Sequence, residues 1–468
     1  MQEPYNGNDK NWVLAITSLA SFMVALDTQV LTSALATIRT QFGVPMETLQ
    51  WTVNAFNLSF AVLLLTGAAL GDRFGRRRLF AAGILLFVAS SVACALSTGI
   101  LSLIVARTAQ GAGSALIMPL GMALLSTAFP KEERARALGI FSGVVGVAVL
   151  AGPAIGGAIT ETLGWPWIFW LNLPIGLFAT FMVMTRLRES FGPAAKLDII
   201  GLMLVAVSAF ALVWGLLRGN GAGWTSPEVV TALAAGLLLA VAFVAWELQT
   251  SAPMVPMRLF RSRALSSGVA AAFLLYGAMY SVLFLLPQFL QSALGYGPLG
   301  VGLRLLPWTA TLFVTAPIAG NIVNRIGERP LVVAELSLQA IGLFWIAAII
   351  TPEAAYTSMI APLVVAGIGV SMSMPAVQNA VLSSVSPVEM GKASGVFNMG
   401  RFLGGMFGVA LLVAVFSGTG AVGSAAGFST GFASAMLVAA LLSSLGALAG
   451  FFLPARKQIA TAPTPQTA

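Results

Sequence analysis

The sequence contains no histidine, and Cys94 is its single cysteine among 468 residues. One thiol cannot form an internal disulfide bond. Without histidine, the chain also lacks the common ligand of zinc sites and the usual base of a nucleophilic cysteine or serine. Metal chemistry and Cys/His nucleophilic catalysis are therefore excluded as explanations of its function.

Charge is also scarce, since 9% of the residues are charged and 58% are hydrophobic, against roughly 25% charged in an ordinary soluble domain. Apolar stretches recur along the chain, each long enough to cross a hydrocarbon core of about 30 Å as a helix. The ten-residue alternation of a membrane barrel is missing. We predict an all-α polytopic membrane protein with fourteen transmembrane helices, whose first span is retained rather than cleaved: 12–34, 50–70, 79–97, 100–126, 137–158, 166–184, 198–217, 229–246, 265–290, 303–323, 331–350, 357–378, 393–417 and 431–453.

The formal net charge of +8 could indicate an anionic partner such as nucleic acid, but the placement of the charges instead predicts how the chain is oriented in the membrane. Nineteen of the 24 lysines and arginines fall in loops on one side of the predicted membrane. The opposite loops hold Arg39 and Arg218, with Arg304 at a helix end. The positive-inside rule then puts both termini in the cytoplasm of a plasma-membrane protein. We expect no nucleic-acid partner.

The chain repeats itself weakly. The stretch "GAGSALIMP" at 111–119 matches "GIGVSMSMP" at 367–375 with an offset of 256, and "DRFGRR" at 72–77 matches "NRIGER" at 324–329 with an offset of 252. Such internal repeats are typical of transporter folds. We predict a 6+2+6 arrangement, with a six-helix half at 1–190, two inserted helices at 191–257, a second half at 258–455 and a cytoplasmic tail at 456–468.

Four stretches of the first half place distinctive residues. The loop "GDRFGRRRL" at 71–79 contains a glycine that permits a tight turn near Asp72. The stretch "AGPAIGG" at 151–157 combines glycines, which allow another helix to pack closely, with a proline, which permits a bend in its own helix. In "RTAQGAG" at 107–113, Arg107 lies inside a span; Asp27 in "SFMVALDTQVLTSAL" at 21–35 lies inside another. Both are roughly 10 Å below the outer boundary. An acid and a base thus lie at matching depth, where charges usually pair or face a cavity.

Together these stretches resemble the motifs of the fourteen-helix drug:proton antiporter branch of the major facilitator superfamily. The resemblance implies that Asp27 and Arg107 couple transport to protons. It also implies a conformational latch with a degenerate second copy, and an antiporter motif in the fifth helix. The chain departs from the family pattern at Ala68, where the family has a glycine, and at Asn324, which replaces the latch aspartate in the copy. It also has Thr32 or Ser33 and Ala36 where the first-helix motif of the family has an asparagine and a proline. The latch residues are Asp72, Arg73, Gly75, Arg76, Arg77, Arg325, Gly327 and Arg329; the antiporter motif is Gly152, Pro153, Gly156 and Gly157.

Each motif also has a plainer interpretation. Asp27 and Arg107 would form a structural ion pair, the loop would be a cluster of topology-determining arginines, and the glycines would serve ordinary packing. Asp27 is expected to be the only acid well inside a span, because Glu247 and Glu335 lie close to helix ends. Polar and aromatic span residues form a candidate substrate pocket, with interhelical hydrogen bonding as the alternative: Asn54, Asn57, Gln288, Gln291, Trp308, Asn398 and Arg401. For Trp51 we favour interfacial anchoring.

The resulting prediction is a secondary transporter that exchanges protons for hydrophobic or cationic organic compounds, as in drug efflux. No nucleotide-binding signature is present, so we expect a proton gradient as the driving force, no cofactor and no enzyme activity. The partners would be a small organic substrate, protons and the lipid bilayer, with the chain acting as a monomer; the sequence identifies no periplasmic adaptor. Alternatives are export of one metabolite or antibiotic, a proton-coupled importer and, least favoured, a membrane enzyme or sensor.

Overall fold

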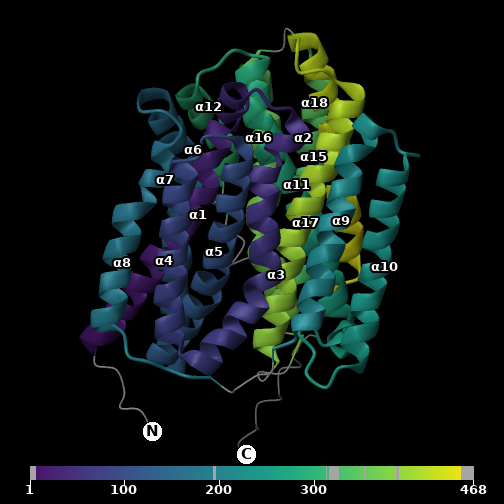
Figure 1. Cartoon of the computed structure of the whole chain (residues 1–468). Coiled ribbons are helices and arrows are strands. Elements are labelled where there is room, and N and C mark those ends of the chain that lie inside the picture. The colour runs from purple at the N-terminus through teal and green to yellow at the C-terminus, as the bar shows by residue number, and fades with distance from the viewer. Residues whose placement is uncertain are drawn as a thin grey trace, which may run out of the picture.

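The computed structural model describes residues 7–192, 197–311, 314–315, 326–352, 355–382, 384–385 and 389–454, and these form a bundle of long helices without a strand (Figure 1). Thirteen of its helices are long and apolar enough to cross a membrane. The tenth of the expected spans, 303–323, is described only at 303–311 and 314–315, and its remaining residues lie outside the described part of the chain. The prediction of a helical, multi-pass membrane protein is confirmed, and thirteen of the fourteen expected spans are seen.

The first half of the chain contains six long helices and two short ones. The first helix is longer than the predicted span because it continues into polar residues at both ends. The expected span 166–184 is built from a short helix followed by a long one, and another short helix directly precedes the expected span 50–70. The bounds are α1 Gly7–Phe42, α2 Met46–Leu49, α3 Trp51–Phe74, α4 Arg76–Ala95, α5 Ile100–Ala128, α6 Lys131–Thr162, α7 Trp167–Trp170 and α8 Asn172–Arg186.

Two helices separate this region from the rest, α9 (Ile199–Ala222) and α10 (Pro227–Gln249). They pack on each other at one flank of the bundle, and α9 also contacts α3 and α17 (Figure 1). Asp198 caps α9 by accepting a hydrogen bond from the Gly201 N–H at 2.8 Å. The remaining elements are η1 Met257–Arg261, α11 Arg263–Ser292, α12 Pro298–Arg304, α13 Leu306–Thr309, α15 Glu328–Ile349, α16 Tyr356–Leu382, α17 Met390–Thr419 and α18 Ala425–Phe451.

The repeat seen in the sequence recurs as a repeat of helix contacts. A Cβ on Gly113 of α5 would lie 2.8 Å from the Phe87 nitrogen of α4, and a Cβ on Gly369 of α16 would lie 2.5 Å from the Gln339 nitrogen of α15. These residues are related by the offsets of 256 and 252. Glycine is needed in both places because the facing backbones leave no room for a side chain. A second pair behaves alike: Gly111 lies against the Phe56 carbonyl, and Gly367 against the Trp308 carbonyl.

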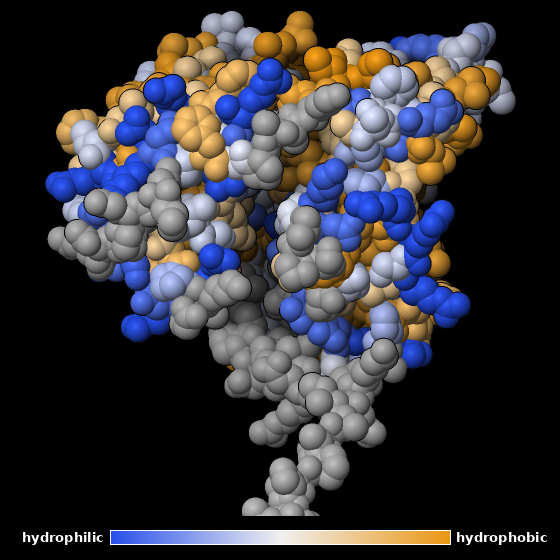
Figure 2. Space-filling model, turned by 90° about the horizontal axis from the view of Figure 1, so that it is seen from below, coloured by the Kyte–Doolittle hydropathy of each residue, from blue (hydrophilic) through white to orange (hydrophobic). Residues whose placement is uncertain are grey.

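The two ends of the bundle differ. We call the end that carries the 71–79 loop the basic end. At the opposite end the first and second halves of the chain are in contact, because the Gln291 side chain donates to the Ser33 carbonyl at 2.8 Å and Arg39 donates to the Ser292 hydroxyl at 3.0 Å. At the basic end they enclose a cavity of about 450 Å³, and Figure 2 shows a hollow between two groups of side chains. The described chain is thus closed at one end and hollowed at the other.

Candidate functional site

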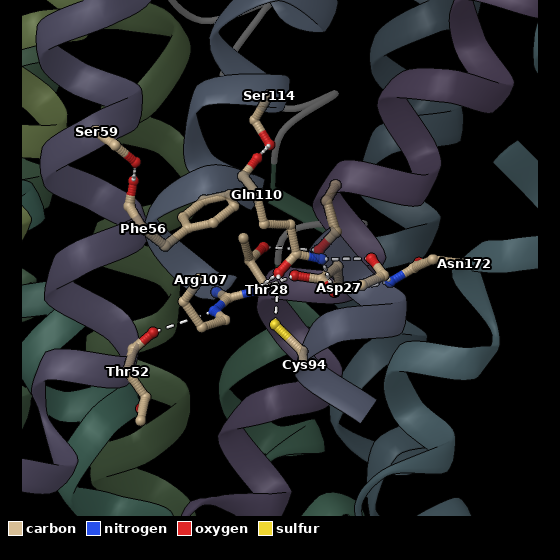
Figure 3. Close-up of polar contacts among 12 residues, drawn as sticks. Asp27, Thr28, Thr52, Phe56, Ser59, Cys94, Arg107, Gln110, Ser114 and Asn172 are labelled. Atoms are coloured by element: carbon tan, nitrogen blue, oxygen red, sulfur yellow. Dashed lines mark hydrogen bonds and ion pairs between the residues drawn. The ribbon is translucent and has the colours of Figure 1, made fainter. Parts of the chain in front are cut away.

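Asp27 and Arg107 meet inside the first half of the bundle (Figure 3). The guanidinium of Arg107 in α5 lies 2.5 Å from the carboxylate of Asp27 in α1, and each residue is 1% exposed. The other carboxylate oxygen accepts hydrogen bonds from the side-chain amides of Gln110 and Asn172, both at 2.8 Å. Three residues from α5 and α8 therefore surround the buried negative charge on α1, and this carboxylate has polar partners inside an apolar bundle.

A second set of contacts holds these partners in place. The Ser91 hydroxyl of α4 accepts from Gln110 at 2.7 Å and from Asn172 at 3.2 Å. Arg107 donates through Nε to the Thr52 carbonyl at 3.1 Å and lies over the Phe56 ring at 4.4 Å. Helices α1, α3, α4, α5 and α8 thus converge on one polar cluster. Proton uptake by its carboxylate would change the balance of every one of these contacts.

Sequence reasoning identified the two charges but missed their amide and hydroxyl partners. Gln110 follows Arg107 by three residues, which places both on one face of α5. That spacing is the one signal by which Gln110 could have been found. Asn172 and Ser91 carried no such signal, because isolated amides and hydroxyls in membrane helices commonly form ordinary interhelical bonds.

The 71–79 loop joins α3 to α4 through Gly75, whose φ of +107° favours glycine. Asp72 pairs with Arg76 one turn later, at 2.8 Å. The N-terminus of α4 is held by a residue that sequence reasoning did not identify: the Glu189 carboxylate accepts from the backbone N–H of Arg77 at 2.8 Å. An acidic side chain is favourable at this position because helix N-termini carry free N–H groups and partial positive charge.

Glu189 also restricts the turn itself, since a Cβ on Gly75 would lie 2.7 Å from its carboxyl carbon. In the second copy of the loop, Gly327 has a similar φ of +86° and Arg329 lies in the first turn of α15. The predicted latch residue Arg325, and Asn324 beside it, lie outside the described residues. The tight turn therefore recurs in both copies.

The glycine motif of α6 lies where several helices pack together. Gly152 and Gly156 face α1 and leave no room for a Cβ against Gln29 and Val30. The carbonyl of Pro153 accepts a hydrogen bond from the Ser33 hydroxyl of α1 at 2.7 Å. Gly157 lies against the backbone of α12 at Pro298 and Leu299. The motif therefore connects the first half of the chain to a segment of the second half near the closed end.

The structure divides the candidate pocket residues. Asn398 and Arg401 line the large cavity at the basic end, and Asn57 lines a narrow cavity beside Arg107. Gln291 instead bridges α11 to α1, as the alternative interpretation expected. Asn54, Gln288 and Trp308 are buried and line neither cavity. Trp51 lies against Phe210 of α9, with ring centroids 5.4 Å apart.

One expectation about interior acids was wrong. Glu247 lies two residues before the end of α10, as expected, but Glu335 lies seven residues into α15 and is 1% exposed. Glu335 is therefore as buried as Asp27. The error arose because α15 begins at Glu328, three residues before the predicted span, so that position 335 is two turns inside the helix.

The model described as "Major Facilitator Superfamily" matches residues 17–409. The chain belongs to the Major Facilitator Superfamily. Within this superfamily it is 34% identical to Multidrug resistance protein Stp of Mycobacterium tuberculosis, over 86% of this chain and 75% of that protein. It is 35% identical to the Cephamycin export protein CmcT of Amycolatopsis lactamdurans, over 88% of this chain and 86% of that protein.

Solved structures agree on the fold. A POT family transporter crystallised with a thioalcohol-conjugated peptide superposes with a TM-score of 0.71 at 16% identity, covering 93% of this chain and 94% of that one. A D-xylose-proton symporter gives a TM-score of 0.68 at 16% identity, covering 95% of this chain and 98% of that one. The major facilitator fold is therefore confirmed, and the family resemblance found in the motifs is confirmed by relatives that confer drug resistance or export an antibiotic.

Proposed function

We propose that this protein is a proton-coupled exporter of hydrophobic organic compounds, working by alternating access. The observation that carries the proposal is the buried Asp27–Arg107 pair, set in a polar cluster beside a narrow cavity that residues from α1, α3, α5 and α11 share. An intramembrane acid with a basic partner is a default candidate for ion transport. The names of the relatives, which refer to multidrug resistance and cephamycin export, favour export over import.

The proposed cycle starts from the state described above. The basic end faces the cytoplasm, as the positive-inside rule predicts, so that the large cavity admits substrate from inside. Closure of this end and opening of the other would expose the substrate to the outside, where Asp27 takes up a proton. The return to the inward-open state releases that proton. Asp72, Arg76 and Glu189 at the basic end would bias this two-state equilibrium.

The division of labour along the chain is also a proposal. Residues 1–190 and 258–455 would be the two moving halves, 191–257 an accessory helix pair, and 456–468 a cytoplasmic tail. The contacts that repeat between Gly113 and Phe87 and between Gly369 and Gln339 support two equivalent halves. The monomer would be the working unit, because both halves are present in one chain. We assign no catalytic role to any residue.

A reconstituted transport assay tests the proposal. Purified protein in liposomes should accumulate a relative's class of substrate, such as a fluorescent antibiotic, when a pH gradient is imposed. Asp27→Asn should abolish this uphill accumulation because the neutral amide cannot bind and release a proton. The control is Glu228→Gln, which removes an exposed acid of α10 that pairs with Arg218 of α9. Uphill accumulation by Asp27→Asn at the wild-type rate would refute the assignment.

A further inference from the structure

The large cavity at the basic end has a distinctive balance of charges. Its walls come mainly from α3, α5, α16 and α17, with one residue each from α4 and α6, and are mostly apolar, with Phe60, Leu64 and Phe402 among them. Asp72 and Arg76 also line it, but these two neutralise each other through their 2.8 Å ion pair. The remaining charged residue among the described lining residues is Arg401 of α17.

Arg401 has no acidic partner among the residues that the structure describes. Its guanidinium lies over the rings of Tyr276 at 4.4 Å and of Phe402 at 5.1 Å and is hydrogen-bonded to the neutral side chain of Tyr280, while its Nε atom is buried without a hydrogen-bond partner. Arg107 provides the contrast, since it is held by a carboxylate, an amide and a carbonyl. An arginine inside a membrane bundle is costly unless something pairs with it.

Arg401 also lies at the depth expected of a substrate site. It is eleven residues beyond the start of α17, or roughly 16 Å along the helix from the basic end. Asn398 lies on the same side of α17 one turn earlier, and Gln378 of α16 also faces this cavity. Amides on two helices and one guanidinium thus line the same otherwise apolar cavity, which is a common design of small-molecule sites.

We propose that Arg401 binds an acidic group of the substrate, so that the exported compounds are amphipathic organic anions, with a carboxylate as the simplest case. The planar fork of arginine matches a carboxylate in two parallel hydrogen bonds. The apolar part of the substrate lies against Phe60, Leu64 and Phe402. A cationic compound would find no unpaired counter-charge on the described walls of this cavity. This inference rests on the proposed export function and replaces the cationic part of the prediction from sequence.

The charge of the substrate has an electrical consequence. If one proton enters while one monovalent anion leaves, two positive charges move inward in each cycle. Exchange of one proton for one monovalent cation moves none. An inside-negative membrane potential therefore accelerates anion export directly.

Two probes that share an apolar body test the charge preference: pyrenebutyrate and a pyrenebutyl trimethylammonium salt. Binding to the purified full-length protein is measured by fluorescence. Pyrenebutyrate should bind the wild type more tightly than the cation does. Arg401→Gln should weaken pyrenebutyrate binding roughly tenfold or more, and Arg401→Lys should retain part of it, because a charge-assisted hydrogen bond is lost completely in the first case and partly in the second.

Arg304→Gln is the matched control, because Arg304 also lies over tyrosine rings, at 3.5 Å from Tyr296 and 5.1 Å from Tyr356, but does not line the cavity. It should bind pyrenebutyrate as the wild type does. Thermal unfolding of each variant shows whether it is folded, and the Arg401→Lys protein keeps the test valid if Arg401→Gln does not fold.

Tighter binding of the cation, or unchanged pyrenebutyrate binding in both Arg401 variants, would overturn the inference. Transport in liposomes then separates it from the proposed function. Arg401-dependent pyrenebutyrate transport that accelerates with a valinomycin-imposed potential and with a pH gradient supports both. If binding depends on Arg401 but the transport rate is unchanged by a pH gradient, the anion site is supported and proton coupling is overturned.

Discussion

The two halves of the molecule share their helix contacts but not their chemistry. The offsets that relate the glycine contacts place Leu363 where the first half has Arg107, Ala366 where it has Gln110, and Leu343 where it has Ser91. All three replacements are fully buried and apolar. The second half has its own interior polar residues at other places, including Glu335 and Gln339 on α15. The repeat therefore preserves close helix packing, while the interior polar residues differ between the two halves.

This difference is informative because packing and charge obey different requirements. A glycine that faces a backbone cannot be replaced without separating two helices, so it recurs in both halves. A buried ion pair is costly and is kept where it serves a function. We infer a division of roles, in which the first half binds the proton at Asp27 and the second half binds the substrate's charge at Arg401.

The largest predicted effect is a difference in transport between variants of the two interior acids, Asp27 and Glu335. Asp27→Asn should reduce uphill transport to background, whereas Glu335→Gln should leave a substantial fraction, because Glu335 lies outside the Asp27 cluster. Proton-driven uptake into liposomes, normalised to the amount of folded protein, measures both. If Glu335→Gln proved the more damaging change, proton binding would belong to the second half and the comparison would be reversed.

The next effect tests whether Arg107 acts on the proton site. Arg107→Lys keeps the charge but loses the fork that contacts Asp27, Gln110 and the Thr52 carbonyl together. Transport should fall roughly tenfold, the size of a typical coupling between sites, and its pH optimum should shift. The repeat-related change Leu363→Met should have little effect, because it conserves apolar volume. A pH profile identical to wild type would leave Arg107 with a structural role alone.

A smaller effect compares the two loops at the basic end. Asp72→Asn removes a charge-assisted hydrogen bond to Arg76, worth about 1.5–3 kcal/mol, and such an amount shifts a two-state equilibrium roughly tenfold or more. Transport should drop, and a thiol reagent should reach an Ala123→Cys probe in the cavity more slowly, in a Cys94→Ala background, because the pair is formed in the inward-open state and its loss disfavours that state. Asn324→Ala in the second copy should do little. Equal effects at both positions would show that the gate is symmetric.

The sequence predicted most of the fold because long apolar runs, basic loops and repeated glycines leave few alternatives for a chain in a bilayer. It also predicted the Asp27–Arg107 pair, because opposite charges at the same depth in apolar spans are expected to form an ion pair. It did not identify Asn172, Ser91 or Glu189. These residues act through contacts between segments far apart in the chain, and amides or loop acids are common enough that no local pattern marks them.

The smallest effect concerns α9 and α10, which have no counterpart in either half. Helix α10 packs on α9 and has exposed central side chains such as Leu238, at 69% exposure. Changing Leu238 to alanine should alter transport less than about twofold, as for surface positions in general.

Helix α9 is different, because Phe210 contacts Trp51 of α3 and Asn220 donates to the Ala414 carbonyl of α17. Phe210→Ala should therefore have a modest effect that is the same for every substrate, because it disturbs how the pair is attached and not what the pathway recognises. Export rates for an anionic and a neutral compound, measured side by side, check this. A loss at Phe210 or Leu238 that affected one compound and spared the other would place the inserted pair in the substrate pathway and would end the description of this protein as two halves with an accessory pair.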